Sequence, residues 1–254
     1  MIITCLVYDK RSLLACSLTC YSWYFAAVPH LHHTLTTDEW TLPPLHSRLR
    51  WPNPLRKSYT LGLLPLVKQF RIRAEYCEFG LDQLNWCTLR YFSALTNLQE
   101  LGIDNLQASE FVPNPRRYFG HLAPTLRFLA LKEPTGSCRQ ILYFVGLFPN
   151  LQDLKFNYSS PMREQDGVDD VALVPLSVPP LRGRLTLTCF SRNKLMRDMI
   201  VLFGGLRFRS MDLYMVTCVR LLLDGCGKTL ETLRLYPSDP YSETFFPQDK
   251  VVVN

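Results

Sequence analysis

The stretch that decides the fold is LQELGI, residues 98–103, with apolar side chains at its first, fourth and sixth positions. The fourth and sixth positions are two residues apart, and in a β-strand such side chains point to the same face of the sheet. This spacing predicts one short strand with a buried face. The same spacing recurs further along the chain, which extends the prediction from one strand to the whole fold.

Six segments follow this apolar-x-x-apolar-x-apolar pattern, and a seventh follows it with Arg182 in the first apolar place. They are VKQFRI (67–72), LQELGI (98–103), LRFLAL (126–131), LQDLKF (151–156), RGRLTL (182–187), FRSMDL (208–213) and LETLRL (230–235). Their starts lie 22 to 31 residues apart. Leucine-rich repeats have a period of roughly 20 to 29 residues. We therefore expect an α/β fold, with an irregular leucine-rich-repeat solenoid and a parallel sheet over residues 61–254.

The segments between the predicted strands include two candidates for return helices. CRQILYFVGLFP (138–149) and NKLMRDMIVLFGGL (193–206) are long and apolar enough for this role. The asparagine that usually follows the strand in leucine-rich repeats is mostly absent, so the repeats are irregular. The alternative is an ordinary α/β domain with leucine-containing buried strands. The number of copies at similar steps favours repeats.

Composition restricts the classes of function. The chain has 254 residues, of which 47% are apolar, so it can bury a sizeable core. Its nine cysteines are an odd, scattered set, unlike the framework of a disulfide-stapled secreted domain. We expect reduced cysteines and a cytoplasmic or nuclear protein. The net charge of +6 comes mainly from residues 181–235. That region lacks a recognised nucleic-acid-binding fold and interleaved aromatic residues, so we expect no nucleic-acid partner.

Residues 12–28 form an uncharged run near the N-terminus. At 17 residues the run is at the lower limit for spanning a bilayer, and its serine and threonine residues argue against a membrane role. At helical spacing its apolar residues form one stripe, which predicts a helix packed on one side. The stripe consists of Leu14, Leu18, Tyr21, Phe25 and Val28. We expect no membrane partner, with a signal anchor as the alternative.

DKRSLLACSLTCYSWYFAAVPHLHHTLT, residues 9–36, resembles the second part of a fungal F-box, the helical module that docks on the Skp adaptor of cullin-RING ubiquitin ligases. The matching residues are Asp9, Ser12, Leu13, Leu14, Cys16, Ser17, Leu18, Thr19, Cys20, Ser22, Trp23, Ala27, Pro29, His30, Leu31, Thr34 and Leu35. Many fungal F-box proteins continue with a proline-containing connector and irregular leucine-rich repeats. The resemblance implies a partial F-box-like module at 1–40, a Pro-rich connector at 41–60 and repeats at 61–254.

The resemblance implies a substrate-recognition subunit of an SCF-type ubiquitin ligase. Such a chain docks on a Skp-type adaptor and holds a protein substrate, not identified by the sequence, on its repeats. Catalysis would belong to the partner ligase, so we expect neither enzymatic activity nor a cofactor. The residues expected to contact the adaptor are Leu13, Leu14, Leu18, Cys20 and Trp23. A buried tryptophan often anchors an interface, although Trp23 would equally suit a core position.

One departure from the F-box pattern leaves two alternatives open. F-boxes of this kind begin with a Leu-Pro-x-Glu turn and a first helix, whereas this chain opens with MIITCLVYDKR. We therefore expect weakened or lost adaptor docking, or an incomplete start. The first alternative function is a leucine-rich-repeat interaction module without a ligase role. The second is a secreted or membrane-anchored repeat protein.

The residue between the two inward-facing positions of each predicted strand should project onto the concave surface. On this argument, with residues on or near the strands included, we expect Arg71, Lys155, Arg209 and Arg234 to bind the substrate. An acidic or phosphorylated peptide would complement them, because arginine binds carboxylate and phosphate bidentately. The alternative is that these side chains only keep the surface soluble.

Metal binding and catalysis find little support in the sequence. Cys16 and Cys20 precede His30, His32 and His33, but the spacing does not match that of a zinc finger. We expect no metal, and we interpret the cysteines as small packing residues. DGCGKT (224–229) ends like a phosphate-binding loop but lacks its first glycine, and it is better explained as a turn.

Overall fold

All seven repeated segments form strands, and these strands lie side by side in chain order in one sheet. The computed structural model describes residues 5–6, 9–37, 62–72, 92–106, 116, 119–158, 180–188, 193–214, 219–226, 229–236 and 251–253. Within them the chain is a mixed α/β protein. The strands are β1 (Thr34–Thr37), β2 (Gln69–Ile72), β3 (Glu100–Asp104), β4 (Phe128–Lys132), β5 (Asp153–Asn157), β6 (Arg182–Thr188), β7 (Arg207–Tyr214), β8 (Thr232–Tyr236) and β9 (Val251–Val253).

Strands β1 to β8 are parallel, and β9 pairs with β8 in the antiparallel direction. The register aligns the repeated pattern across the sheet, so that Leu101 lies between Phe70 and Leu129 on the neighbouring strands. Ile103 is aligned with Ile72 and Leu131 in the same way. All of these side chains are buried, so the predicted strands and their inward faces are confirmed.

The core contains a row of phenylalanine rings that runs from one strand-and-return unit to the next. Phe70 on β2 contacts Phe92, which contacts Phe119, with ring centroids 5.3 and 5.7 Å apart. Phe119 contacts Phe144, which contacts Phe148, at 5.2 and 5.5 Å. All four contacts are edge-to-face, the geometry that aromatic quadrupoles favour. The row joins successive units into one hydrophobic core.

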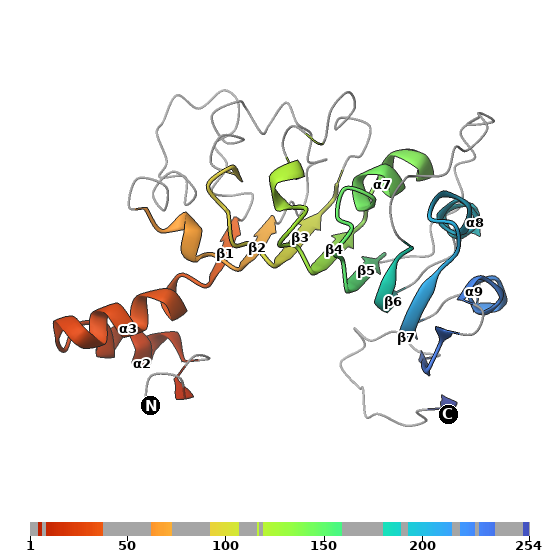
Figure 1. Ribbon diagram of the computed structural model, residues 1–254. Helices are drawn as coiled ribbons and strands as arrows, with labels where there is room; N and C mark the ends of the chain where they lie inside the picture. The colour runs from red at the N-terminus through yellow and green to blue at the C-terminus, as the bar shows by residue number, and fades with distance from the viewer. Residues whose placement is uncertain are drawn as a thin grey trace.

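Three helices lie on one side of the sheet, as Figure 1 shows. They are α7 (Cys138–Val145), α8 (Asn193–Leu202) and α9 (Val219–Cys226). Helices were predicted over 138–149 and 193–206, and the structure has a helix in each segment, which ends four residues earlier than predicted. Helix α7 begins with a capping box, in which the Ser137 hydroxyl accepts from the Gln140 backbone and the Gln140 side chain accepts from the Ser137 backbone. Two short 3₁₀ helices, η2 (Leu64–Leu66) and η4 (Gly120–Leu122), form other returns.

Two helices, α2 (Lys10–Ser17) and α3 (Tyr21–Leu31), extend beyond the β1 edge of the sheet (Figure 1). The single helix expected over residues 12–28 is therefore wrong. Near the end of α2 the Ser17 hydroxyl donates to the Leu14 carbonyl at 2.7 Å, and the Thr19 hydroxyl donates to the Ala15 carbonyl at 3.1 Å. These bonds occupy carbonyls of the last turn, and such side-chain bonds compete with helix continuation.

The sheet begins earlier in the chain than the sequence indicates. Strand β1 lies within residues 1–40, for which the sequence predicts a helical module, and it pairs with β2. Its sequence, TLTT, has one apolar residue and therefore lacks the repeated pattern. The predicted connector at 41–60 lies outside the described residues. Among the residues that the structure describes, no helix is long and apolar enough to cross a membrane.

Candidate functional site

Large apolar side chains are exposed mainly on the two N-terminal helices and the turn between them. Six of the eight exposed large apolar side chains in the described residues belong to this pair, including Leu18 at 80% and Tyr21 at 78% exposure. We call this set the apolar helical surface. It consists of Leu14, Leu18, Tyr21, Trp23, Tyr24 and Phe25. Contiguous exposed apolar surface on a protein typically marks an interaction site.

The helical pair has a small core of its own. Leu13 and Ala27 are fully buried, with Leu6 and Leu31 packed against them. Asp9 caps α2 by accepting from the backbone N–H groups of Arg11 and Ser12, both at 3.1 Å. The Ser12 hydroxyl also donates to this carboxylate, which lowers the pKa of Asp9. This core holds the two helices together but leaves the apolar helical surface exposed.

The structure divides the residues expected to bind the adaptor into two groups. Leu14, Leu18, Cys20 and Trp23 are exposed, although Trp23 is only 38% exposed. Leu13 is buried between α2 and α3, where it supports the other residues and cannot contact a partner directly. The stripe that we expected to pack inward is largely exposed instead, because Leu13 and Ala27 form the packed side of the helices.

Two aromatic residues of the stripe, Tyr21 and Phe25, were not among the expected adaptor contacts. Their rings lie in edge contact, with centroids 4.5 Å apart. Tyr24, which lies outside the stripe, contacts Phe25 at 5.5 Å. Stripe membership was the available signal for Tyr21 and Phe25. Exposure, which distinguishes a docking face from a core face, is visible only in the structure.

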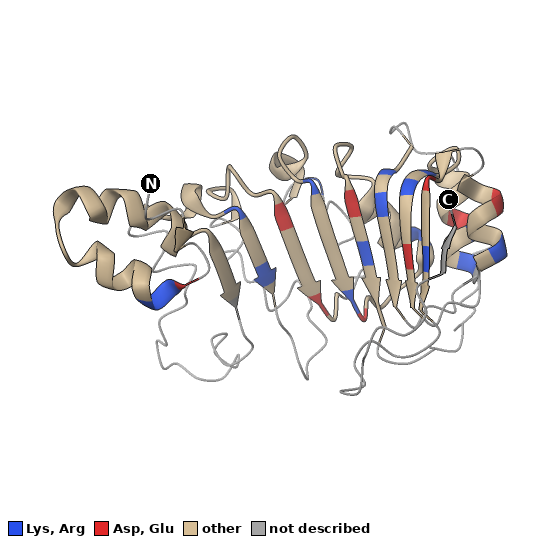
Figure 2. Ribbon diagram, turned by 90° about the horizontal axis from the view of Figure 1, so that it is seen from below, with Lys and Arg blue, Asp and Glu red and all other residues tan. Residues whose placement is uncertain are grey.

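The sheet face opposite α7, α8 and α9 is polar, and we call it the polar face. The strand register aligns one residue from each of β1 to β8 into a row across this face. Figure 2 shows charged residues of both signs on these strands. The row consists of Thr36, Arg71, Gly102, Ala130, Lys155, Thr186, Asp212 and Arg234. Three of the four residues expected to bind substrate lie in this row. Arg209 lies outside it, near the start of β7.

Arg71 lies over the neighbouring strand. A Cβ atom at Gly102 would be 3.2 Å from Arg71 Nε and 3.4 Å from its Cγ. The glycine therefore leaves room for the arginine side chain to lie across β3. After Arg71, Gly102 and Ala130, the next charged residue in the row is Lys155 on β5.

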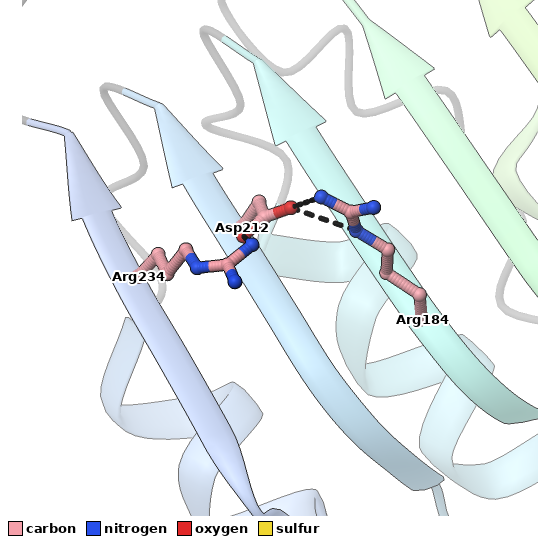
Figure 3. A network of polar contacts seen from close by, with 3 residues as sticks. All are labelled: Arg184, Asp212 and Arg234. Atoms are coloured by element: carbon pink, nitrogen blue, oxygen red, sulfur yellow. Dashed lines mark hydrogen bonds and ion pairs between the residues drawn. The ribbon is translucent and has the colours of Figure 1, made fainter. Parts of the chain in front are cut away.

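Arg234 shares a carboxylate with Arg184, as Figure 3 shows. Arg184 Nε donates to Asp212 Oδ2 at 2.8 Å, and Arg184 Nη2 donates to the same oxygen. Arg234 Nη1 donates to Asp212 Oδ1 at 3.4 Å. The Asp212 residue is 1% exposed, whereas the guanidinium-bearing side chains of Arg184 and Arg234 are 46% and 40% exposed. Hydrogen bonding to Asp212 raises the pKa of Arg184.

The ion pairs reduce the free positive charge that the sequence indicates on this face. Arg234 is paired with Asp212, and Arg209 lies 3.7 Å from Glu231. Asp153, which lies beside Arg184 in the register, has a pKa raised by burial. Charges of both signs therefore alternate across β5 to β8. The four residues expected to bind the substrate therefore fall into two groups. Arg71 and Lys155 lie on either side of Gly102 and Ala130 in the row, and Arg209 and Arg234 form ion pairs with Glu231 and Asp212.

Two tyrosines lie next to the Asp212 network along β7 and β8. The rings of Tyr214 and Tyr236 stack in parallel, with centroids 4.1 Å apart and an interplanar angle of 6°. Burial and the neighbouring Tyr236 raise the pKa of Tyr214 to about 12. The stacked pair lies at the ends of these two strands.

No family model matches this chain, and no curated protein matches it. The geometry of the two surfaces therefore carries the functional argument. Among the described residues, no group of three or more His, Cys, Asp or Glu side chains is placed to hold a metal ion. The described residues thus present two surfaces suited to protein contacts, one apolar and one charged.

Proposed function

We propose that this chain is the substrate-recognition subunit of an SCF-type cullin-RING ubiquitin ligase. In this role α2 and α3 dock on a Skp-type adaptor, and the polar face holds a protein substrate. The observation that carries the proposal is the apolar helical surface, whose large side chains all fall within residues 14–25. The resemblance of residues 9–36 to part of a fungal F-box supports the adaptor as the partner.

Exposed apolar area on α2 and α3 favours docking, because a partner would remove it from water. Each buried Å² of apolar surface stabilises a complex by roughly 25 cal/mol before the costs of association. Leu18 and Tyr21, the most exposed members, offer the largest gain, and Trp23 is already partly covered. Aromatic residues are enriched among the side chains that dominate interface energies.

The strands follow one another in chain order with helices on one side, an arrangement that supports an irregular leucine-rich-repeat solenoid. Catalysis would belong to the ligase that the adaptor recruits. We place the protein in the cytoplasm or nucleus, where its cysteines would stay reduced.

The proposal is tested by capture of a purified Skp-type adaptor on the immobilised full chain. Trp23→Ala and Leu18→Ala should each weaken capture, and the tryptophan variant should lose about 2 kcal/mol, which is roughly 30-fold in Kd. Val201→Ala is the matched control, because Val201 on α8 is an exposed apolar residue at 47% that lies outside the apolar helical surface. Circular dichroism checks that each variant is folded.

Three outcomes would reject this role or part of it. Failure of the folded wild-type chain to capture the adaptor would favour the alternative, a repeat-type interaction module without ligase function. The Arg184–Asp212–Arg234 network supports that alternative, because it orders the polar face without any help from α2 and α3. Equal capture by wild type and both helical variants would remove the apolar helical surface from the interface. Equal weakening by Val201→Ala would show that the effect is not local to α2 and α3.

A further inference from the structure

Positive charge is concentrated at one end of the sheet. Strands β1 to β5 carry three basic and three acidic residues, whereas β6 to β8 carry five arginines and one aspartate (Figure 2). The five arginines are Arg182, Arg184, Arg207, Arg209 and Arg234. Within the sheet, the excess of positive charge is therefore confined to three adjacent strands.

Four of these arginines meet at the starts of β6 and β7. Arg182 and Arg207 are register partners on neighbouring strands, and Arg184 and Arg209 follow two residues later on each strand. All four are exposed. Like charges placed directly opposite each other destabilise a sheet. Within the described residues no ion pair involves Arg182 or Arg207, so an external anion would relieve their repulsion.

A β-bulge gives this end of the sheet its shape. Gly183 pairs with Phe208, but Arg184 pairs with Ser210, so Arg209 is the extra residue on β7. Gly183 has a φ of +86°, and a Cβ atom there would collide with the carbonyl group of Gln152. Bulges re-aim side chains and are frequent near functional sites. Arg207 and Arg209 are both exposed, on either side of the buried Phe208, and the extra residue lets Met211 also face the core, three residues after Phe208.

We propose that Arg182, Arg184, Arg207 and Arg209 form a docking surface for an acidic peptide segment, rich in aspartate or glutamate, of a partner protein. The proposal specifies the substrate chemistry of the proposed function and rests on that function for the partner being a substrate. Arg182 and Arg207 can bind carboxylates bidentately, because arginine forks match carboxylate geometry. Arg184 and Arg209 are already paired with Asp212 and Glu231, and they add positive charge beside the first two. Residues two apart on a strand are roughly 6.6 Å apart, so an extended segment with carboxylates at alternate positions would follow the arginines along β6 and β7.

A nucleic acid is the competing polyanion, and the arrangement of aromatic residues disfavours it. Single-stranded nucleic acids bind where bases stack on aromatic side chains along a basic groove. The aromatic pair, Tyr214 and Tyr236, lies at the ends of β7 and β8, whereas Arg182, Arg207 and Arg209 lie at the starts of β6 and β7. The two rings stack on one another. The arginine cluster therefore offers charge without a platform for bases.

The test measures binding of a fluorescent peptide of alternating glutamate and serine to the purified full chain by anisotropy. Combined Arg182→Gln and Arg207→Gln should weaken binding about tenfold, because two exposed ion pairs contribute up to roughly 1 kcal/mol each. Combined Arg197→Gln and Arg220→Gln removes the same charge from α8 and α9, which lie on the other side of the sheet, and should change binding less than about twofold. Thermal unfolding checks that both variants are folded.

Three results would overturn the proposal. The first is no binding by the folded wild-type chain. The second is equal weakening by both double variants, which would show an effect of net charge alone. The third is tighter binding of oligouridylate than of the peptide. Adaptor capture is scored separately on the same preparations. Lost capture with intact peptide binding rejects the ligase role alone, and intact capture without peptide binding rejects the acidic-peptide surface alone.

Discussion

Arg184 on β6 and Asp212 on β7 are joined through a single carboxylate oxygen, Oδ2, which accepts from both Nε and Nη2 of the guanidinium group. The other oxygen, Oδ1, accepts from Arg234 on β8. One buried carboxylate thus links three neighbouring strands on the polar face. The two arginines keep contact with solvent while the aspartate does not, and this asymmetry has a measurable consequence.

Removing the two arginines should destabilise the protein more than removing the aspartate charge. Arg184→Gln combined with Arg234→Gln leaves a buried carboxylate without its cations, for which we expect a loss of about 3 kcal/mol in the free energy of unfolding. Asp212→Asn leaves two arginines that can turn toward water, for which we expect about 1 kcal/mol. Urea unfolding measures both values. A larger loss for Asp212→Asn than for the double arginine variant would show that other groups stabilise the buried carboxylate.

The same network revises an expectation drawn from the sequence. From the sequence alone, Arg209 and Arg234 are predicted to be exposed, and exposed substitutions usually change stability by no more than about 0.5 kcal/mol, so charge reversal at both is expected to be neutral for folding. That still applies to Arg209, since it and its partner Glu231 are both well exposed. At Arg234 a glutamate would lie beside buried Asp212, so Arg209 is the better site for a reversal that tests binding alone.

Gly183→Ala should destabilise the sheet at the β6–β7 bulge. The residue has a φ of +86°, and the added Cβ would lie 2.8 Å from the carbonyl carbon of Gln152, within a backbone that cannot yield easily. We expect a loss of about 3 kcal/mol or more, which combines backbone strain with a steric clash.

Gly204→Ala is the matched control for the bulge variant. Gly204 also has a positive φ, +63°, but a Cβ atom added there would have no other atom within 4 Å. It should therefore lose only the conformational cost of about 1 kcal/mol. Thermal unfolding of the two variants separates the strain from the clash, and equal losses would show that the Gln152 contact contributes nothing.

Alkaline pH should weaken the folded state through Cys226. Burial raises the pKa of this thiol to about 11 from an ordinary value of 9.0. Between these two values the folded state holds a proton that the unfolded state releases. The stabilisation is therefore fully present below about pH 9 and is lost as the pH rises through about 11. Tyr214, with a pKa of about 12, adds a loss of the same sign at higher pH.

Cys226→Ala isolates the thiol contribution from that of the tyrosine. Measured by urea unfolding between about pH 8 and about pH 10.5, the variant should lose less stability than the wild type. In the native wild type at neutral pH, the buried Cys226 should also react with a thiol reagent more slowly than the exposed Cys20. Identical pH profiles for wild type and variant would exclude Cys226 as a source of the alkaline loss.

Strand positions and their inward faces were predictable because they follow from local periodicity. The segment 98–103 shows the alternation that places Leu101 and Ile103 in the core, and the structure confirms both. The start of α7 was anticipated in the same way, since its apolar residues recur along residues 138–149. Strand β1 was missed because pairing with β2, and not its own composition, makes it a strand.

The sequence by itself determined which residues form most of the strands, which of their side chains face the core and that residues 181–235 hold the positive charge. Only the tertiary structure decided that Leu18 is exposed while Leu13 is buried, that Arg234 is held by Asp212 and that Arg182 lies opposite Arg207. Periodicity is a local property that can be recognised along the chain. Contacts between strands more than twenty residues apart depend on register and on the bulge at Gly183, which arise only when the whole sheet is assembled.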